Sequence, residues 1–169
     1  MLVTLAFTIA SLLMWLEMRA TVKLAEEGQR SWVLFDTIVW TEPPSNKPCE
    51  IILRVKNFGR IPATIFDSGF KVGIGPQSEL DAFFKTFEFK TPPGVGSIGP
   101  NQSIDYKLKC GPFTEQELGS ITTLQRSLYV VGFVRYADLY SPHRNMEHCV
   151  FWSPERNGYA LCPTHNKYD

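Results

Sequence analysis

The sequence predicts a mainly β protein: an antiparallel two-sheet sandwich that follows an N-terminal helix and contains one short helix before the penultimate long strand. Residues 50–56 and 103–110 alternate between apolar and polar side chains, which is typical of antiparallel strands with one face in solvent. Six or seven strand-like segments also follow one another without the strand–helix rhythm of a parallel sheet. We therefore expect two sheets packed face to face.

The N-terminal stretch Met1–Leu16 contains no charged side chain and is mostly apolar, so we predict a membrane anchor. As a helix it would cover about 24 Å of a hydrocarbon core that is about 30 Å thick. Trp15 and Met18 would extend it into the interface, where Trp is favoured. Two alternatives stay open. One is a cleavable signal peptide, although the stretch lacks a basic leader and a small-residue cleavage site. The other is a buried or interfacial helix.

Residues 17–30 suit a helix and contain no proline, so we expect the anchor to continue as a stalk that ends near Gly28. This prediction divides the chain in two. Residues 1–30 form the transmembrane anchor and helical stalk, and residues 31–169 form the β-sandwich domain.

Basic residues predict the orientation of the anchor. Arg19, Lys23 and Arg30 follow the apolar stretch and no Lys or Arg precedes it. Because basic flanks stay in the cytoplasm, we expect a single-pass protein of the inner (cell) membrane whose domain lies in the cytoplasm. The alternative is an extracytoplasmic domain. In the cytoplasm the cysteines would stay reduced.

The first strands of the domain can be placed by composition. Residues 32–40 are rich in β-branched and aromatic side chains. A proline-rich loop over 42–48 separates them from the alternating strand over 50–56. After a connection over 57–62, a further strand is expected over 63–74, with Pro tolerated just before it.

The middle of the chain is harder to assign. Residues 77–89 favour a short helix followed by a strand, and the alternative is an edge strand. Residues 91–101 have the composition of a long loop. Phe83, Phe84 and Phe87 are interpreted as core residues or as an exposed apolar contact patch.

The second half of the domain begins with a helix signal. Thr114 lies three residues ahead of Glu117, as in a capping box, and Leu118, Ile121 and Leu124 repeat every third residue behind it. Three more strands are then expected. They cover 128–137, which is apolar on both faces as in a central strand, 143–152, and 159–162.

Composition excludes some functions. Lys plus Arg is 17 and Asp plus Glu is 17, and no basic block is present. This balance argues against nucleic-acid binding, which needs a basic face. Residues 94–99 are glycine-rich, but no helix follows to form a phosphate-binding loop. No small-molecule substrate is evident, and we expect neither a cofactor nor catalysis.

The C-terminal part gathers most residues that could carry chemistry. They are Asp138, His143, His148, Cys149, Cys162 and His165. Cys149, Cys162, His165 and His148 are candidates for a four-coordinate zinc site. A Cys149–Cys162 disulfide and free buried thiols are the alternatives. Adjacent strand residues point to opposite faces, which argues against His148 activating Cys149 as a nucleophile.

Several stretches, in this order, resemble a family of small uncharacterised bacterial membrane proteins. They are Gln29–Val33, Val55–Ala63, Ile98–Ser103, Leu128–Asp138 and Cys162–Asn166. The chain departs from the family at Leu139–Pro142, where a Phe-Gly turn usually follows the aspartate. The resemblance implies an N-terminal transmembrane helix, a helical stalk and an immunoglobulin-like β-domain. It implies no activity and no catalytic residues.

Together these observations predict a membrane-anchored, non-catalytic protein-interaction module. Its expected partners are the membrane, through the single N-terminal helix, and another protein, through edge strands or loops. The alternative is a metal-binding or thiol redox-sensing domain that uses the C-terminal Cys/His cluster.

Overall fold

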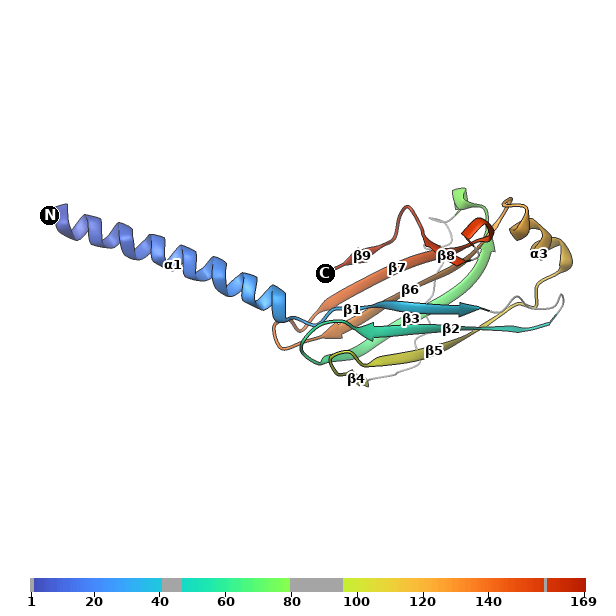
Figure 1. Ribbon diagram of the computed structural model, residues 1–169, viewed down its shortest axis with the longest axis horizontal. Coiled ribbons are helices and arrows are strands. Elements are labelled where there is room, and N and C mark those ends of the chain that lie inside the picture. The colour runs from blue at the N-terminus through green and yellow to red at the C-terminus, as the bar shows by residue number, and fades with distance from the viewer. Residues whose placement is uncertain (1, 41–46, 80–95, 157) are drawn as a thin grey trace.

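The computed structural model describes residues 2–40, 47–79, 96–156 and 158–169, with side chains from Leu12 onward in the first helix. The protein is mainly β, with two antiparallel sheets and a long N-terminal helix (Figure 1). The three Phe residues of the predicted contact patch lie outside the described residues. At the start of the predicted helix the structure has a 3₁₀ turn, η1 (Gln77–Glu79).

The two sheets face each other as a β-sandwich, as the alternating patterns predict. The first sheet has the order β1-β2-β5 and consists of β1 (Val33–Trp40), β2 (Cys49–Asn57) and β5 (Ser103–Cys110). The second has the order β4-β3-β6-β7-β8, with β9 also paired to β7. Its strands are β3 (Ala63–Gly75), β4 (Gly96–Ile98), β6 (Ser127–Ala137), β7 (Arg144–Ser153), β8 (Gly158–Leu161) and β9 (Lys167–Tyr168).

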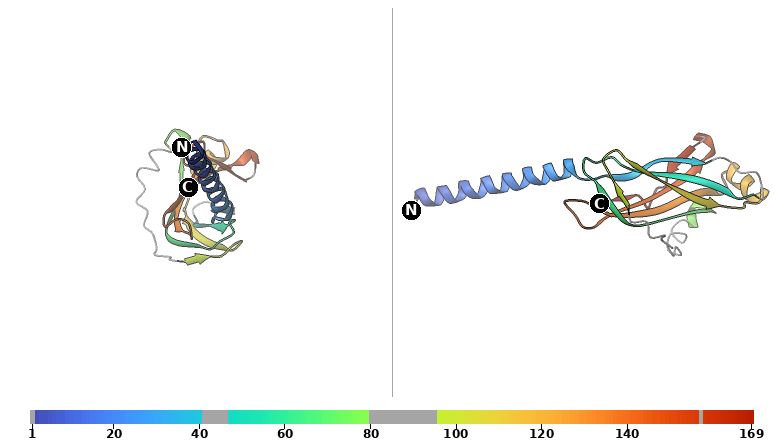
Figure 2. Two further views of the ribbon diagram at one scale, coloured as in Figure 1. Left: turned by 90° about the vertical axis from the view of Figure 1, so that its left-hand side faces the viewer. Right: turned by 90° about the horizontal axis from the view of Figure 1, so that it is seen from below.

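The helix α1 (Leu2–Gln29) runs without interruption through the predicted anchor and stalk. Its 28 residues correspond to a length of about 42 Å. Figure 2 shows that α1 leaves one end of the sandwich, while α3 lies at the opposite end. Within the described part of the chain, no helix combines the length and the apolar character needed to cross a membrane. The predicted transmembrane span therefore has no support from this structure.

The core lies between the sheets and follows the predicted alternation. Ile51, Leu53 and Val55 of β2 are fully buried, while Glu50 and Arg54 are exposed and Ile52, the apolar exception in the alternation, is partly buried. The central strand β6 is buried along nearly its whole length, as predicted for a strand covered on both faces. Burying each such aliphatic side chain stabilises the fold by roughly 1.5–3 kcal/mol.

The predicted capping box is confirmed at the start of α3 (Glu115–Thr122). The Glu117 N–H donates to the Thr114 hydroxyl at 3.2 Å, and the Thr114 N–H donates to the Glu117 carboxylate at 2.9 Å. Ile121 of this helix is buried against the sandwich. The α3 helix thus closes the end of the core that lies away from α1 (Figure 1).

Two edge strands were not predicted. β4 forms inside the stretch 91–101, whose composition predicts a loop, and pairs with the first residues of β3. β9 pairs Tyr168 with Met146 of β7. Both strands are very short, so neither contains enough residues to show a period of two. Ile98 shows why β4 matters, because its side chain is buried in the core.

Candidate functional site: a groove at the open edge of the sandwich

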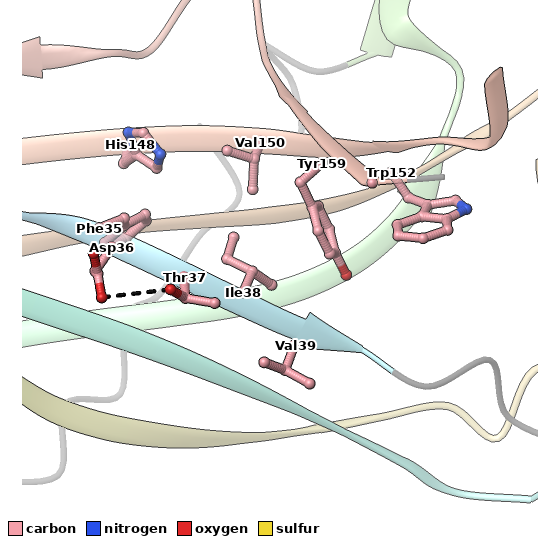
Figure 3. A pocket seen from close by; sticks show the side chains of 10 residues that line it. Phe35, Asp36, Thr37, Ile38, Val39, His148, Val150, Trp152 and Tyr159 are labelled. Carbon is pink, nitrogen blue, oxygen red and sulfur yellow. Dashed lines mark hydrogen bonds between the residues drawn. The ribbon is translucent and has the colours of Figure 1, made fainter. Parts of the chain in front are cut away.

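A groove runs along one open side of the sandwich, between β1 and the strands β7 and β8. It has a cavity volume of about 580 Å³. The side chains that argue for a function line it from both sheets: Phe35 and Ile38 from β1, His148, Val150 and Trp152 from β7, and Tyr159 from β8 (Figure 3). β1 is the outermost strand of its sheet, and no strand among the described residues pairs with its free side.

A β-bulge in β1 shapes this groove. The register shifts between Phe35, which pairs with Val55, and Thr37, which pairs with Arg54. The extra residue, Asp36, is exposed. A bulge adds one residue to a strand and resets its alternation. Phe35 and Ile38 can therefore both line the groove although they are three residues apart.

His148 forms the polar part of one groove wall, and it carries no charge at neutral pH. Its ring packs edge-on against Phe35, with 4.2 Å between ring centroids, and its Nδ1 lies 2.7 Å from the Tyr168 hydroxyl. Only 7% of the residue is exposed. This burial lowers the pKa of the imidazole to about 4.

Tyr159 and Trp152 form the other end of the groove. Their rings meet edge to face, with centroids 5.4 Å apart. The Tyr159 hydroxyl is buried and has no hydrogen-bond partner among the described groups. Burial raises the pKa of this phenol, so it stays protonated. A buried hydroxyl without a partner is unusual in folded proteins, and this one belongs to a side chain that lines an open groove.

The C-terminal Cys/His residues do not come together as a zinc site. Cys149 and Cys162 form a disulfide with 5.4 Å between their Cα atoms. Both sulfurs are therefore unavailable as thiolate ligands. His148 lies in the groove, whereas Cys149 packs with Tyr129 and Val131 on the other face of the sheet. No group of three His, Cys, Asp or Glu side chains in the described residues could hold a metal ion.

The Cys162–Asn166 stretch closes against β7 through an asparagine side chain. The Asn166 Oδ1 accepts a hydrogen bond from the Cys149 N–H at 3.1 Å, and its Nδ2 donates to the Cys162 carbonyl at 2.9 Å. His165 lies in the intervening turn with a φ of 63°. This part of the predicted cluster is a connection between the edge strands β8 and β9.

A second disulfide, which the spacing of the cysteines does not predict, joins Cys49 and Cys110. These residues are direct partners in the register of β2 and β5, with 5.0 Å between their Cα atoms. No free cysteine occurs among the described residues. The only sequence signal is that Cys49 directly precedes the predicted strand over 50–56 and Cys110 ends the one over 103–110. That signal becomes useful only once the strand pairing is known.

Asp138, the acidic residue among the C-terminal residues that could carry chemistry, has a structural role. Its Oδ2 accepts hydrogen bonds from the Arg144 Nε at 2.8 Å and from the Ser31 hydroxyl at 3.0 Å. Its Oδ1 accepts from the backbone N–H groups of Tyr140 and Ser141. Asp138 therefore fastens the β6–β7 turn to the chain between α1 and β1, and it is not one of the residues that line the groove.

Comparison with known proteins assigns no family to this chain. No family model matches the chain, and no curated protein matches it either. One solved structure, a crystal structure of a protein from Archaeoglobus fulgidus, is similar over 71% of this chain and 98% of that chain. The sequence identity is 9% and the TM-score is 0.36.

Proposed function

We propose that this chain is a membrane-anchored, non-catalytic protein-interaction module that binds another protein at the groove between β1 and β7–β8. The observation that carries the proposal is the edge of β1, which pairs with no strand among the described residues. It lies beside a groove of mixed polarity, lined by Tyr159, whose buried hydroxyl has no partner among the described groups. Free backbone groups and an unsatisfied hydroxyl are both able to accept a partner.

The strand order supports an immunoglobulin-like type of sandwich. β1, β2 and β5 match strands A, B and E of that fold, while β3, β6 and β7 match C, F and G. β4 extends the second sheet beside β3, as an additional strand does in variable-type domains. The resemblance to the bacterial membrane-protein family implies the same fold, and we include that family in the proposal.

Membrane anchoring is supported by the sequence and position of α1. The helix projects from the domain (Figure 1), and Leu12, Leu13 and Leu16 are exposed on it. The Arg19 guanidinium lies 3.9 Å from the Trp15 ring, an arrangement that suits the membrane interface. We propose that the uncharged residues 1–16 enter lipid and that the following turns form the stalk. Extraction of native membranes with carbonate tests this, and release of the full chain into the supernatant would end the proposal.

The two disulfides favour an extracytoplasmic domain over the cytoplasmic position that the basic residues indicate. Disulfides persist in oxidising compartments and are rare in the cytosol. Three basic residues are a weak orientation signal by comparison. Thiols can be trapped with acid in intact cells and then labelled with a maleimide polymer. We expect no labelled cysteine, whereas labelling of all four would place the domain in the cytoplasm.

Metal binding and thiol redox sensing, the alternative functions, receive no specific support. Both cysteines of the proposed cluster are in a disulfide whose residues are buried. A reactive thiol needs exposure and an electropositive environment.

Photo-cross-linking in the native host tests the interaction. A benzophenone amino acid is placed in the full chain at Val39, which is exposed beside the groove, or at Lys109, which is exposed on β5 of the same sheet. We expect a discrete product with one other protein from position 39 and none from position 109. Equal products from both positions, or none from either, would overturn the proposed function.

A further inference from the structure

The partner can be described more closely if the proposed function holds, and this inference rests on it. We propose that the partner presents an extended segment, which adds as a strand to Thr37–Trp40 of β1 and directs an uncharged, hydrogen-bonding side chain at Tyr159.

The first argument is the free edge of β1. Thr37, Ile38, Val39 and Trp40 pair in unbroken register with residues 54 to 51 of β2. Their other side faces no strand among the described residues. Four residues in regular register are about 13 Å long. The bulge at Asp36 interrupts the ladder on one side, so a strand that adds here would pair with this stretch and not with all of β1.

The second argument is the position of the groove under that edge. Figure 3 shows β1 passing beside the groove, with Ile38 and Tyr159 facing the same space. Alternate side chains of an added strand point to one face. Every second side chain of the segment would therefore enter the space between β1 and β7–β8. A strand uses both the backbone edge and the groove, whereas a small molecule would use the groove alone.

The third argument concerns the polarity of the entering side chain. The Tyr159 hydroxyl is buried and has no partner among the described groups, and its side chain packs with Trp152, Val150 and Ile38. An entering side chain therefore reaches this hydroxyl by displacing one of these neighbours. An amide or hydroxyl can both donate to it and accept from it.

The fourth argument is charge. Asp36 is the one ionised side chain among the described residues that line the groove. His148 is neutral at neutral pH because burial lowers its pKa to about 4. An acidic side chain in the segment would meet the Asp36 carboxylate, and Arg54, the cation that interacts with Asp36 from β2, is not among the described residues that line the groove. We therefore expect no acidic residue at the inward positions of the segment, and Ser, Thr, Asn or Gln at the position that faces Tyr159.

A random twelve-residue peptide library displayed on phage, selected on the full chain in detergent micelles, provides the probe. Enriched peptides are synthesised, and their binding is measured by fluorescence anisotropy. We expect their alternate, inward positions to lack acidic residues and one of these positions to hold Ser, Thr, Asn or Gln. N-methylation of alternate backbone amides should weaken binding at least tenfold, because it removes strand hydrogen bonds and leaves side chains intact.

The role of Tyr159 is isolated by a double-mutant cycle. Replacing the inward polar residue of the peptide by Ala should weaken binding about three- to tenfold with the parent chain, and not with Tyr159→Phe. Tyr129→Phe, on the other face of the sheet, should behave like the parent.

The outcomes separate this inference from the proposed function. Peptides that tolerate N-methylation, a polar preference that persists in Tyr159→Phe, or a library without enriched sequences would each overturn strand addition. A specific cross-link at position 39 would then still support a protein partner. Dimers of the chain in sedimentation that disappear on adding an enriched peptide would identify a second copy as the occupant, and would also overturn the inference.

Discussion

The Asp138 carboxylate accepts hydrogen bonds from both the N–H and the hydroxyl of Ser31, at 3.3 and 3.0 Å, although 107 residues separate them. Ser31 is fully buried and lies two residues after the end of α1. Arg144 shares the same carboxylate oxygen. The end of the stalk is thus fixed to the turn between β6 and β7, and the direction in which α1 leaves the domain follows from that attachment.

Asp138→Asn should destabilise the domain by about 3–5 kcal/mol, because it leaves the Arg144 cation without its partner. The Asp138 side chain is 0% exposed and that of Arg144 is 14% exposed. Urea unfolding of the full chain measures the loss. Asp105→Asn is the control: it breaks the Arg54–Asp105 pair, whose side chains are 45% and 41% exposed, and should cost less than about 1 kcal/mol. Equal losses in the two variants would contradict the argument.

The same pair predicts a pH dependence. Burial raises the pKa of Asp138, but the hydrogen bonds from Arg144, Ser31 and the turn outweigh it and hold the pKa below its ordinary value of 3.8. The folded chain therefore binds this proton less readily than the unfolded chain. The resulting stability is present above about pH 4 and is lost as the pH falls through the folded pKa. Asp138→Asn should lack this component of acid unfolding.

Gly59→Ala should be strongly destabilising. A Cβ at Gly59 would overlap the Arg30 carbonyl oxygen and the Ser31 Cα, and would lie 2.6 Å from the Trp32 nitrogen. These are backbone atoms that cannot turn aside, so we expect a cost of about 3 kcal/mol. Gly119→Ala is the matched control, because nothing lies within 4 Å of the new Cβ in helix α3. It should stabilise by about 0.5–1 kcal/mol in thermal or urea unfolding. If Gly59→Ala left the stability unchanged, the backbone of residues 30–32 could not lie as close to Gly59 as in this structure.

Features with a local cause were predictable from the sequence, as β2 and α3 show. The alternation over 50–56 and the Thr114–Glu117 capping box depend on neighbouring residues, and the structure confirms both. The bulge at Asp36 and the Cys49–Cys110 bridge depend on strand register, which involves residues distant in sequence. The groove has the same origin, because Ile38 and Tyr159 meet only after both sheets have formed.

Removing the two disulfides should have unequal effects. Cys49 and Cys110 close a loop with a sequence separation of 61 residues, whereas Cys149 and Cys162 are separated by 13. Loop-closure entropy then gives about 4 kcal/mol for the first bridge and about 3 kcal/mol for the second. Double Cys→Ser variants, unfolded in urea without reductant, measure both losses. A larger loss for the Cys149–Cys162 pair would mean that local packing outweighs chain entropy.

His148 should make the chain less stable in mild acid. Its pKa is lowered from 6.5 to about 4 by burial, so between these values the unfolded chain binds the proton and the folded chain does not. Stability is therefore complete above about pH 6.5 and falls by up to about 3 kcal/mol towards pH 4. Urea unfolding across this range should show the slope in the parent and not in His148→Gln. His143→Gln, which changes an exposed histidine, should keep the slope. If the pH slope of the stability persisted in His148→Gln, a titrating group other than His148 would be its cause.

Tyr159→Phe should stabilise the free chain, in contrast to most substitutions of buried residues. The hydroxyl is buried without a partner among the described groups, so its removal relieves a desolvation cost of about 1 kcal/mol and leaves the ring packed on Trp152. Tyr136→Phe supplies the opposite case, because the buried Tyr136 hydroxyl donates to the Ser31 carbonyl and its loss should destabilise by about 1 kcal/mol. Urea unfolding of both variants gives the two signs. A destabilised Tyr159→Phe would mean that the hydroxyl is already satisfied in the free protein. The groove would then lack the unsatisfied group on which its proposed selectivity depends.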